Sequence, residues 1–219
     1  MLFRDRTEAG RILASKLHAY ADRPDVLVLG LPRGGVPVAY EVAAQLHVPL
    51  DIFLVRKLGV PGRRELALGA IASGGVTIFN GVGEALGIDE EEIDRIVKSE
   101  QVELEVRDHL LRDGRPQLEV AGHTVILVDD GLATGSSMRA AVHALRKRQP
   151  DRVVVAVPVG SPETCAQIRA EVDELICVRT PAWFYAIGIW YQNFPETTDQ
   201  EVREFLARAE AFTTQPQTI

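Results

Sequence analysis

The densest group of residues that could do chemistry lies in the stretch 125–137. An apolar run, Val125-Ile126-Leu127-Val128, leads directly into two carboxylates, Asp129 and Asp130. A glycine-containing turn then leads to small and hydroxyl side chains, which are Ala133, Thr134, Gly135, Ser136 and Ser137. The apolar run predicts a buried strand, and the hydroxyl residues after the turn predict a helix N-terminus. The free N–H groups and the dipole of such a helix start can bind a phosphate.

The two aspartates suit a different chemical group from the helix start. Carboxylates repel a phosphate, whereas they accept hydrogen bonds from a diol and coordinate Mg²⁺. A ligand with a phosphate at one end and a cis-diol at the other is a ribose 5-phosphate. Taken alone, Asp129-Asp130 is more often a polar strand end, and a Thr-Gly-Ser turn is more often an ordinary helix cap. Their ordered combination favours a ligand site.

This segment resembles the 5-phosphoribosyl-1-pyrophosphate motif of type I phosphoribosyltransferases, and the similarity extends over most of residues 1–210. The chain looks like a bacterial and archaeal group of that family, which shares three further segments. Here they read Asp5-Arg6, Pro32-Arg33-Gly34-Gly35 and Ala186-Ile187-Gly188-Ile189-Trp190-Tyr191. The resemblance implies that Asp129 and Asp130 contact the ribose hydroxyls, partly through Mg²⁺ held by way of water, and that residues 133–137 hold the 5-phosphate.

Basic residues after the first two predicted strands can neutralise a pyrophosphate. Arg33, Gly34 and Gly35 follow the first strand, and the resemblance implies that this loop grips the pyrophosphate. Taken alone, an Arg-Gly-Gly sequence is as often an ordinary tight turn. Arg56 and Lys57 end the second predicted strand, and we expect them to contact the pyrophosphate as well. Arg33 and Lys57 are the expected catalytic cations.

Two further segments are expected to complete the site. The Gly-, Pro- and Arg-rich residues 58–66 resemble the catalytic loop of this fold, and such a lid excludes water and prevents hydrolysis. Arg63 is expected to reach the leaving group, and Glu65 to act as a base or an anchor. After the last strand the family has a hood over the base, where Trp183 and Phe184 are expected to stack on a flat heterocycle. An aromatic cluster at this place is equally compatible with core packing.

The acceptor of the phosphoribosyl group stays open. Enzymes of the family that act on 6-oxopurines carry an aspartate before the Thr-Gly of the motif, where this chain has Ala133. The expected reaction is displacement of pyrophosphate by a nitrogen of a base or other amine. Two alternatives are a regulator that binds the sugar pyrophosphate or a nucleotide without turnover, and a hydrolase of phosphorylated sugars. The retained Arg56-Lys57 pair and the arginine-rich loop favour an enzyme.

The elements that must position these residues alternate along the chain. Apolar runs predict strands over 25–30, 50–56, 125–128, 153–157 and 174–178. Helical patterns lie over 5–21, 36–46, 88–112, 161–171 and 198–210, and a hairpin with Gly74-Gly75 at its turn is predicted over 67–79. The alternation predicts an α/β fold with a mostly parallel central sheet and helices on both faces, in which ligands bind at the carboxyl ends of the strands.

The resemblance places one phosphoribosyltransferase domain over residues 1–219. Its core is expected over about 22–178, with a helical insertion over about 84–113, a hood over about 179–196 and a terminal helix over 198–210.

Charge and composition limit the partners. The net charge of −7, without a broad basic face, argues against binding of duplex DNA or RNA. No apolar run approaches the roughly 20 residues of a membrane span, and the first residues lack the apolar core of a signal peptide. Cys165 and Cys177 are expected to be reduced and structural. We therefore expect a cytoplasmic homo-oligomer that binds small substrates, without nucleic-acid or membrane partners.

Overall fold

The computed structural model describes residues 1–60 and 62–212, except for the side chains of residues 64 and 65. Five strands form its central sheet: β1 (Val26–Gly30), β2 (Leu50–Ile52), β6 (Thr124–Val128), β7 (Arg152–Val159) and β8 (Glu174–Arg179). They pair in the order β2-β1-β6-β7-β8, and every pair is parallel. The carboxyl ends of the strands therefore lie at one edge. The predicted α/β class with a mostly parallel sheet is confirmed.

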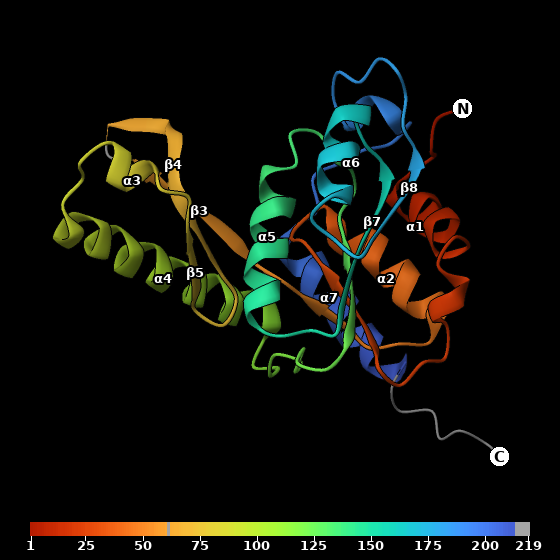
Figure 1. Ribbon diagram of the computed structural model, residues 1–219. Helices are drawn as coiled ribbons and strands as arrows, with labels where there is room; N and C mark the ends of the chain where they lie inside the picture. The colour runs from red at the N-terminus through yellow and green to blue at the C-terminus, as the bar shows by residue number, and fades with distance from the viewer. Residues whose placement is uncertain (61, 213–219) are drawn as a thin grey trace.

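Helices cover both faces of this sheet (Figure 1). One face packs against α1 (Arg6–Ala14) and α2 (Gly35–Leu46), and the other packs against α5 (Ser136–Lys147) and α6 (Pro162–Arg169). Because both faces are covered, every residue of β1 and β6 is buried, which explains their uninterrupted apolar sequences. The last helix, α7 (Asp199–Ala209), packs beside α2 and starts with a capping box formed by Thr198 and Glu201.

A second sheet projects to one side of the central sheet (Figure 1). Its antiparallel strands are β3 (Val55–Val60), β4 (Arg63–Ala72) and β5 (Val76–Phe79). A short helix, α3 (Val82–Ala85), leads to the long helix α4 (Glu90–Arg112), which covers one face and buries Leu58, Leu68 and Leu104. On the other face, Val55 and Ile78 pack against the cluster that contains α5. The second sheet is thus fixed between α4 and α5.

The segment between the two sheets corrects two of the sequence predictions. The strand predicted over 50–56 is wrong in extent, because β2 ends at Ile52 and Val55 starts a strand of the other sheet. The loop predicted over 58–66 is wrong as well, because most of that stretch belongs to β3 and β4. Glycine and proline suggested a loop, but Leu58 and Val60 alternate with less buried neighbours and pack under α4, which favours a strand.

The other elements follow the predictions more closely. The helix predicted over 5–21 ends at Ala14 and is followed by a 3-10 turn over His18–Tyr20, so its extent was wrong. The hairpin over 67–79 is confirmed, with Ala72 paired to Val76 across its turn. The remaining strands and helices lie within a few residues of their predicted bounds, whereas α3 was not predicted. Across residues 1–60 and 62–212, no helix has the length and apolarity needed to span a membrane.

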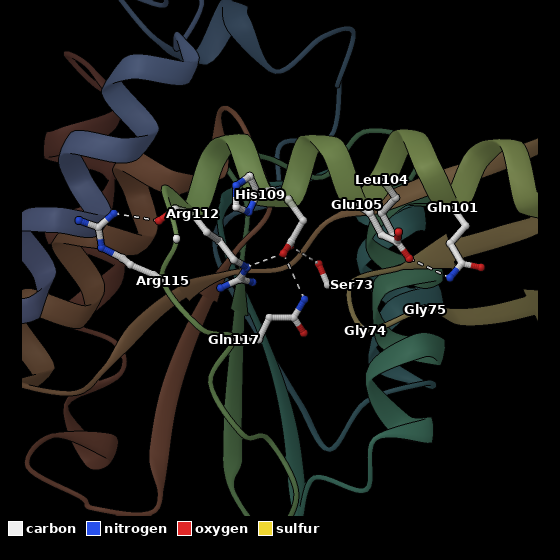
Figure 2. Close-up of a pocket in the computed structure, with 12 residues that line it drawn as sticks. Ser73, Gly74, Gly75, Gln101, Leu104, Glu105, His109, Arg112, Arg115 and Gln117 are labelled. Atoms are coloured by element: carbon white, nitrogen blue, oxygen red, sulfur yellow. Dashed lines mark hydrogen bonds and ion pairs between the residues drawn. The ribbon is translucent and has the colours of Figure 1, made fainter.

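A buried polar cluster ties α4 to the link between the two sheets. Figure 2 shows part of it, with Arg112 of α4 and Ser73 on the same side of the helix. Arg112 is 3% exposed and pairs with Asp51, which is 5% exposed, and with Asp108 at 2.9 Å. Ser73 donates to Asp108 at 3.2 Å and accepts from the Leu54 N–H at 2.9 Å. The cluster forms one wall of a cavity of about 360 Å³. It fixes the stretch of chain from which β3 starts.

Removal of Arg112 should leave Asp51 buried without its cation. We expect Arg112→Ala to lower the free energy of unfolding by about 3–5 kcal/mol, as measured by urea denaturation. Arg95→Ala, on the exposed side of the same helix, is the matched control and should change that free energy by no more than about 0.5 kcal/mol. Equal effects of the two substitutions would show that the Arg112 cluster does not anchor the second sheet.

Candidate phosphate- and ribose-binding site

Two loops meet closely at the carboxyl edge of the central sheet. The loop after β1 ends at Gly34, next to Gly35, the first residue of α2, and the loop after β6 begins with Asp129 and Asp130. A Cβ on Gly34 would lie 2.1 Å from Oδ2 of Asp130, and a Cβ on Gly35 would lie 2.9 Å from Cα of Asp129. Such distances leave no room for a side chain, so glycine is required at both positions. The two predicted segments therefore form one site.

Asp130 is bound by an arginine from the start of the chain. The Nε and Nη2 atoms of Arg6 each lie 2.9 Å from Oδ2 of Asp130, and both side chains are 11% exposed. The Arg6 guanidinium also lies 3.8 Å from the ring centroid of Phe194 and donates to the carbonyl oxygen of Pro195 at 2.6 Å. Arg6 thus joins the first turn of α1 to the carboxylate pair and to the segment after β8.

Asp129 pairs with no cation among the described residues. Its Oδ1 accepts from the backbone N–H of Asp130 at 2.8 Å. Burial raises the pKa of Asp129 well above its ordinary value, and the charge of Asp130 raises it further. Burial also raises the pKa of Asp130, although Arg6 opposes that shift. Because only one of the two carboxylates is paired with a guanidinium, the pair favours the approach of a cation or of hydroxyl donors.

The predicted phosphate turn leads into the N-terminus of α5. Gly135 precedes the helix with a φ of 71°, a left-handed conformation that favours glycine. Thr134 and Ser137 are exposed, and the hydroxyl oxygen of Thr134 lies 3.2 Å from that of Ser136. No side chain caps the start of α5, and its first turn contains no acidic residue. Its N–H groups can therefore bind an anion.

The start of α6 supports this turn. The hydroxyl of Thr164 donates to the carbonyl oxygen of Ala133 at 2.6 Å, and its methyl carbon lies 2.5 Å from where a Cβ on Gly135 would be. Leu132 and Gly160 form a parallel bridge at the same place. The turn is thus held by contacts from the loop after β7.

The sequence matches the family described as phosphoribosyl transferase domain over residues 5–67 and 56–188. The chain belongs to this family. The Mycobacterium tuberculosis H37Rv protein Rv0571c, which bears a provisional phosphoribosyl transferase name, is 45% identical over 209 residues, covering 95% of this chain and 47% of that protein. This phosphoribosyl transferase domain therefore spans about half the length of the curated relatives it matches.

Solved structures share the fold of this phosphoribosyl transferase domain. TT1426 from Thermus thermophilus is 42% identical, with a TM-score of 0.84 over 95% of this chain and 99% of that chain. A hypoxanthine-guanine phosphoribosyltransferase from Bacillus anthracis is 10% identical, with a TM-score of 0.50 over 90% of this chain and 95% of that chain. The second similarity concerns the fold alone. The resemblance to type I phosphoribosyltransferases inferred from the sequence is confirmed.

The carboxylate pair of this phosphoribosyl transferase domain fits Mg²⁺. Asp129 and Asp130 supply hard oxygen atoms whose negative charge Arg6 balances only in part. Within the described part of the chain, no three His, Cys, Asp or Glu side chains gather into a closed metal cage. Mg²⁺ is commonly held by one or two carboxylates together with water and substrate oxygens, so such a cage is not needed. Binding of Mg²⁺ stays a prediction.

Arg33 lies in the loop beside the carboxylates but is engaged elsewhere. The peptide bond between Pro32 and Arg33 is cis. The Arg33 guanidinium pairs with Glu196 and lies 3.6 Å from Oδ1 of Asp199. It would have to leave Glu196 to bind a pyrophosphate, and its side chain is 36% exposed. Its role at the leaving group stays a prediction.

Among the described side chains of the second sheet, no cation forms an ion pair with Asp129 or Asp130. Arg56 and Lys57 lie inside β3 rather than at the end of a parallel strand, which corrects their predicted placement. Arg56 donates to Glu100 of α4 at 2.7 Å, and Lys57 is exposed. Arg63 lies at the far tip of the β3–β4 hairpin, where it lines a cavity of about 330 Å³. The side chain of Glu65 falls outside the described residues.

In the segment after β8, some aromatic side chains pack in the core and others are exposed to solvent. Trp183 is 78% exposed, whereas Phe184 packs against a buried cluster that includes Phe3 and Tyr191. Tyr191 is 5% exposed, and its hydroxyl donates to the carbonyl oxygen of Asp130 at 2.6 Å. Trp183 is therefore freer than Phe184 to meet a ligand. Contact of either residue with a base stays a prediction.

Sequence reasoning assigned no role to three residues that fix this site. Arg6 binds the Asp130 carboxylate. Thr164 donates to the carbonyl oxygen of Ala133, and Tyr191 donates to the carbonyl oxygen of Asp130. Arg6 and Tyr191 lie in segments that carry the family resemblance, Asp5-Arg6 and Ala186–Tyr191. The sequence therefore offered a signal for these two residues. No local pattern singles out Thr164, because a Ser-Pro-Glu-Thr sequence is an ordinary helix start.

Neutralising Asp129 should stabilise the ligand-free domain. Its pKa is higher in the folded than in the unfolded chain, so the folded state binds more protons and stability falls as pH rises through that window. Asp129→Asn keeps an oxygen that accepts from the Asp130 N–H, and it removes the buried charge that lowers stability at neutral pH. We expect the melting temperature at pH 7.5 to rise by about 2–4 °C, and the gain to vanish near pH 4.

The control for Asp129→Asn is Asp25→Asn. The hydrogen bond from Arg23 lowers the pKa of Asp25, so this substitution should not raise the melting temperature at pH 7.5. A lower melting temperature for Asp129→Asn at pH 7.5 would contradict the assigned electrostatics.

Arg6 should be needed to hold Asp130 in place. We expect Arg6→Ala to cost about 3 kcal/mol of unfolding free energy, because a buried carboxylate loses its cation. Arg6→Lys should recover part of the loss, since it restores the charge but not the two-atom contact or the ring stacking. Chemical denaturation checks both variants against Arg4→Ala, an exposed neighbour. An Arg6→Ala effect no larger than that of Arg4→Ala would refute the assignment.

Proposed function

We propose that this domain binds 5-phosphoribosyl-1-pyrophosphate with Mg²⁺ and transfers the phosphoribosyl group to a nitrogen of a base or other amine, releasing pyrophosphate. The observation that carries the proposal is the placement of the Asp129–Asp130 pair beside the uncapped N-terminus of α5. An anion site and a hydroxyl or cation site adjoin each other at the same sheet edge. A phosphorylated pentose has the complementary groups at its two ends.

The reaction forms a bond between the acceptor nitrogen and C1 of the ribose and breaks the bond between C1 and the pyrophosphate oxygen. The proton lost by the acceptor passes to a base or to solvent. Positive charge develops on the sugar, and negative charge develops on the leaving group. Catalysis then consists mainly of positioning and electrostatic stabilisation.

Each part of the site has one task in this scheme. The amides and hydroxyls of residues 134–137 hold the 5-phosphate, and Asp129 accepts hydrogen bonds from the ribose hydroxyls. Arg6 keeps Asp130 ionised and correctly oriented. Bound Mg²⁺ supplies positive charge to the pyrophosphate. Arg33 and Lys57 add further positive charge, once Arg33 exchanges Glu196 for the leaving group.

A pyrophosphate-release assay tests the proposal. The purified protein is mixed with 5-phosphoribosyl-1-pyrophosphate, Mg²⁺ and a panel of purines, pyrimidines and amines. Release that depends on one acceptor supports transfer. Release without any acceptor would instead indicate a hydrolase. Stabilisation of the fold by the sugar pyrophosphate, without release under any condition, would indicate a regulator that binds without turnover.

Lys57 provides a sharper test of the leaving-group site. We expect Lys57→Ala to lower the turnover number at least about tenfold, because a cation that stabilises developing charge is lost. Its melting temperature should stay within about 1 °C of wild type, since the side chain is exposed. Lys98→Ala, an exposed lysine of α4, is the matched control. Unchanged turnover in Lys57→Ala would remove Lys57 from the mechanism.

A further inference from the structure

Two thiols face each other beneath the phosphate turn. Cys165 lies in α6 and Cys177 lies in β8, and neither is in a disulfide. A Cβ on Gly160 would lie 2.6 Å from Sγ of Cys165 and 3.5 Å from Sγ of Cys177, so the two sulfur atoms are neighbours. Sγ of Cys177 also lies 3.1 Å from the carbonyl oxygen of Arg179.

This thiol pair contacts the segments that hold the phosphate turn. Cys165 directly follows Thr164, whose hydroxyl holds the carbonyl of Ala133. Gly160, which separates the thiols from the turn, bridges to Leu132, and the Leu132 N–H donates to the Val159 carbonyl at 2.8 Å. A movement of α6 toward β8 would therefore change the support of the turn directly.

The two thiols differ in reactivity. The neighbouring Cys177 thiol lowers the pKa of Cys165, whereas the neighbouring Cys165 thiol and burial raise the pKa of Cys177. Cys165 is therefore the sulfur that ionises first and acts as the nucleophile. Cys165 is 2% exposed and Cys177 is only partly buried, so Cys177 is the more exposed of the two residues.

We propose that Cys165 and Cys177 form an oxidation site for hydroperoxides that controls the 5-phosphate turn. The Cys165 thiolate attacks one peroxide oxygen, the O–O bond breaks, and the other oxygen leaves as water or an alcohol. The resulting sulfenic acid is attacked by the Cys177 sulfur, which forms the disulfide and releases water. Two electrons pass from the two thiols to the peroxide, so the reaction is balanced.

The disulfide would disturb the turn because it shortens the distance between the two sulfur atoms. A disulfide requires the sulfur atoms to approach to about 2 Å, closer than any hydrogen-bonded contact between thiols. Its formation draws α6 toward β8 and moves Thr164 away from the Ala133 carbonyl. The turn before α5 loses this support, and its amides become less well placed for a phosphate. Only the weaker binding of a phosphate rests on the proposed function.

The test compares the reduced and the peroxide-treated protein. We expect treatment with hydrogen peroxide to remove two hydrogen atoms from the intact mass, to consume both thiols, and to be reversed by dithiothreitol. Amide hydrogen exchange over residues 131–137 should become about tenfold faster in the oxidised form. Cys165→Ser and Cys177→Ser are matched controls, and neither should show the faster exchange after the same treatment.

Two results would overturn the inference: thiols that resist peroxide or gain oxygen without forming a disulfide, and a disulfide that leaves the exchange of residues 131–137 unchanged. Neither readout uses the sugar pyrophosphate. A reduced protein that fails to bind 5-phosphoribosyl-1-pyrophosphate in calorimetry would reject the proposed function alone, whatever the mass and exchange results.

Discussion

Two carboxylates at the end of a buried strand concentrate negative charge where water screens it poorly, and one guanidinium offsets it. The contact between Arg6 and Asp130 is the interaction on which the rest of this site depends. It fixes one carboxylate and leaves the charge of the other, Asp129, unbalanced. Under the proposed function, this arrangement, unfavourable in the ligand-free chain, would become favourable when a cation or a diol binds, and functional sites commonly carry such a local cost.

The fold separates the two ends of the proposed ligand. The proposed ribose and 5-phosphate positions lie at the ends of β1 and β6, whose residues are all buried. The cations Arg56 and Lys57 belong to the second sheet, whose position depends on α4 and on the Asp51–Arg112 cluster. Under the proposed function, sugar binding would therefore depend on the central sheet, whereas contact with the pyrophosphate would depend on the position of the second sheet.

The parts of the site that are contiguous in the sequence could be predicted, and those assembled from distant segments could not. The stretch from Asp129 to Ser137 is a strand end, a turn and a helix start in unbroken order, so its chemistry is visible locally. Arg6 reaches Asp130 from 124 residues away, and no spacing rule connects them. The stretch over 58–66 was misread for another reason. Its glycine and proline content outweighed the alternation of Leu58 and Val60, whose burial depends on the distant helix α4.

The measurement that tests the central claim most directly is a crystal structure of the protein with 5-phosphoribosyl-1-pyrophosphate and Mg²⁺. The account predicts phosphate oxygens within about 3 Å of the backbone amides at residues 134–137. It also predicts that the ribose hydroxyls face Asp129, with Asp130 still held by Arg6. A sugar phosphate bound elsewhere, or one bound at this edge with Asp129 turned away from it, would contradict the account.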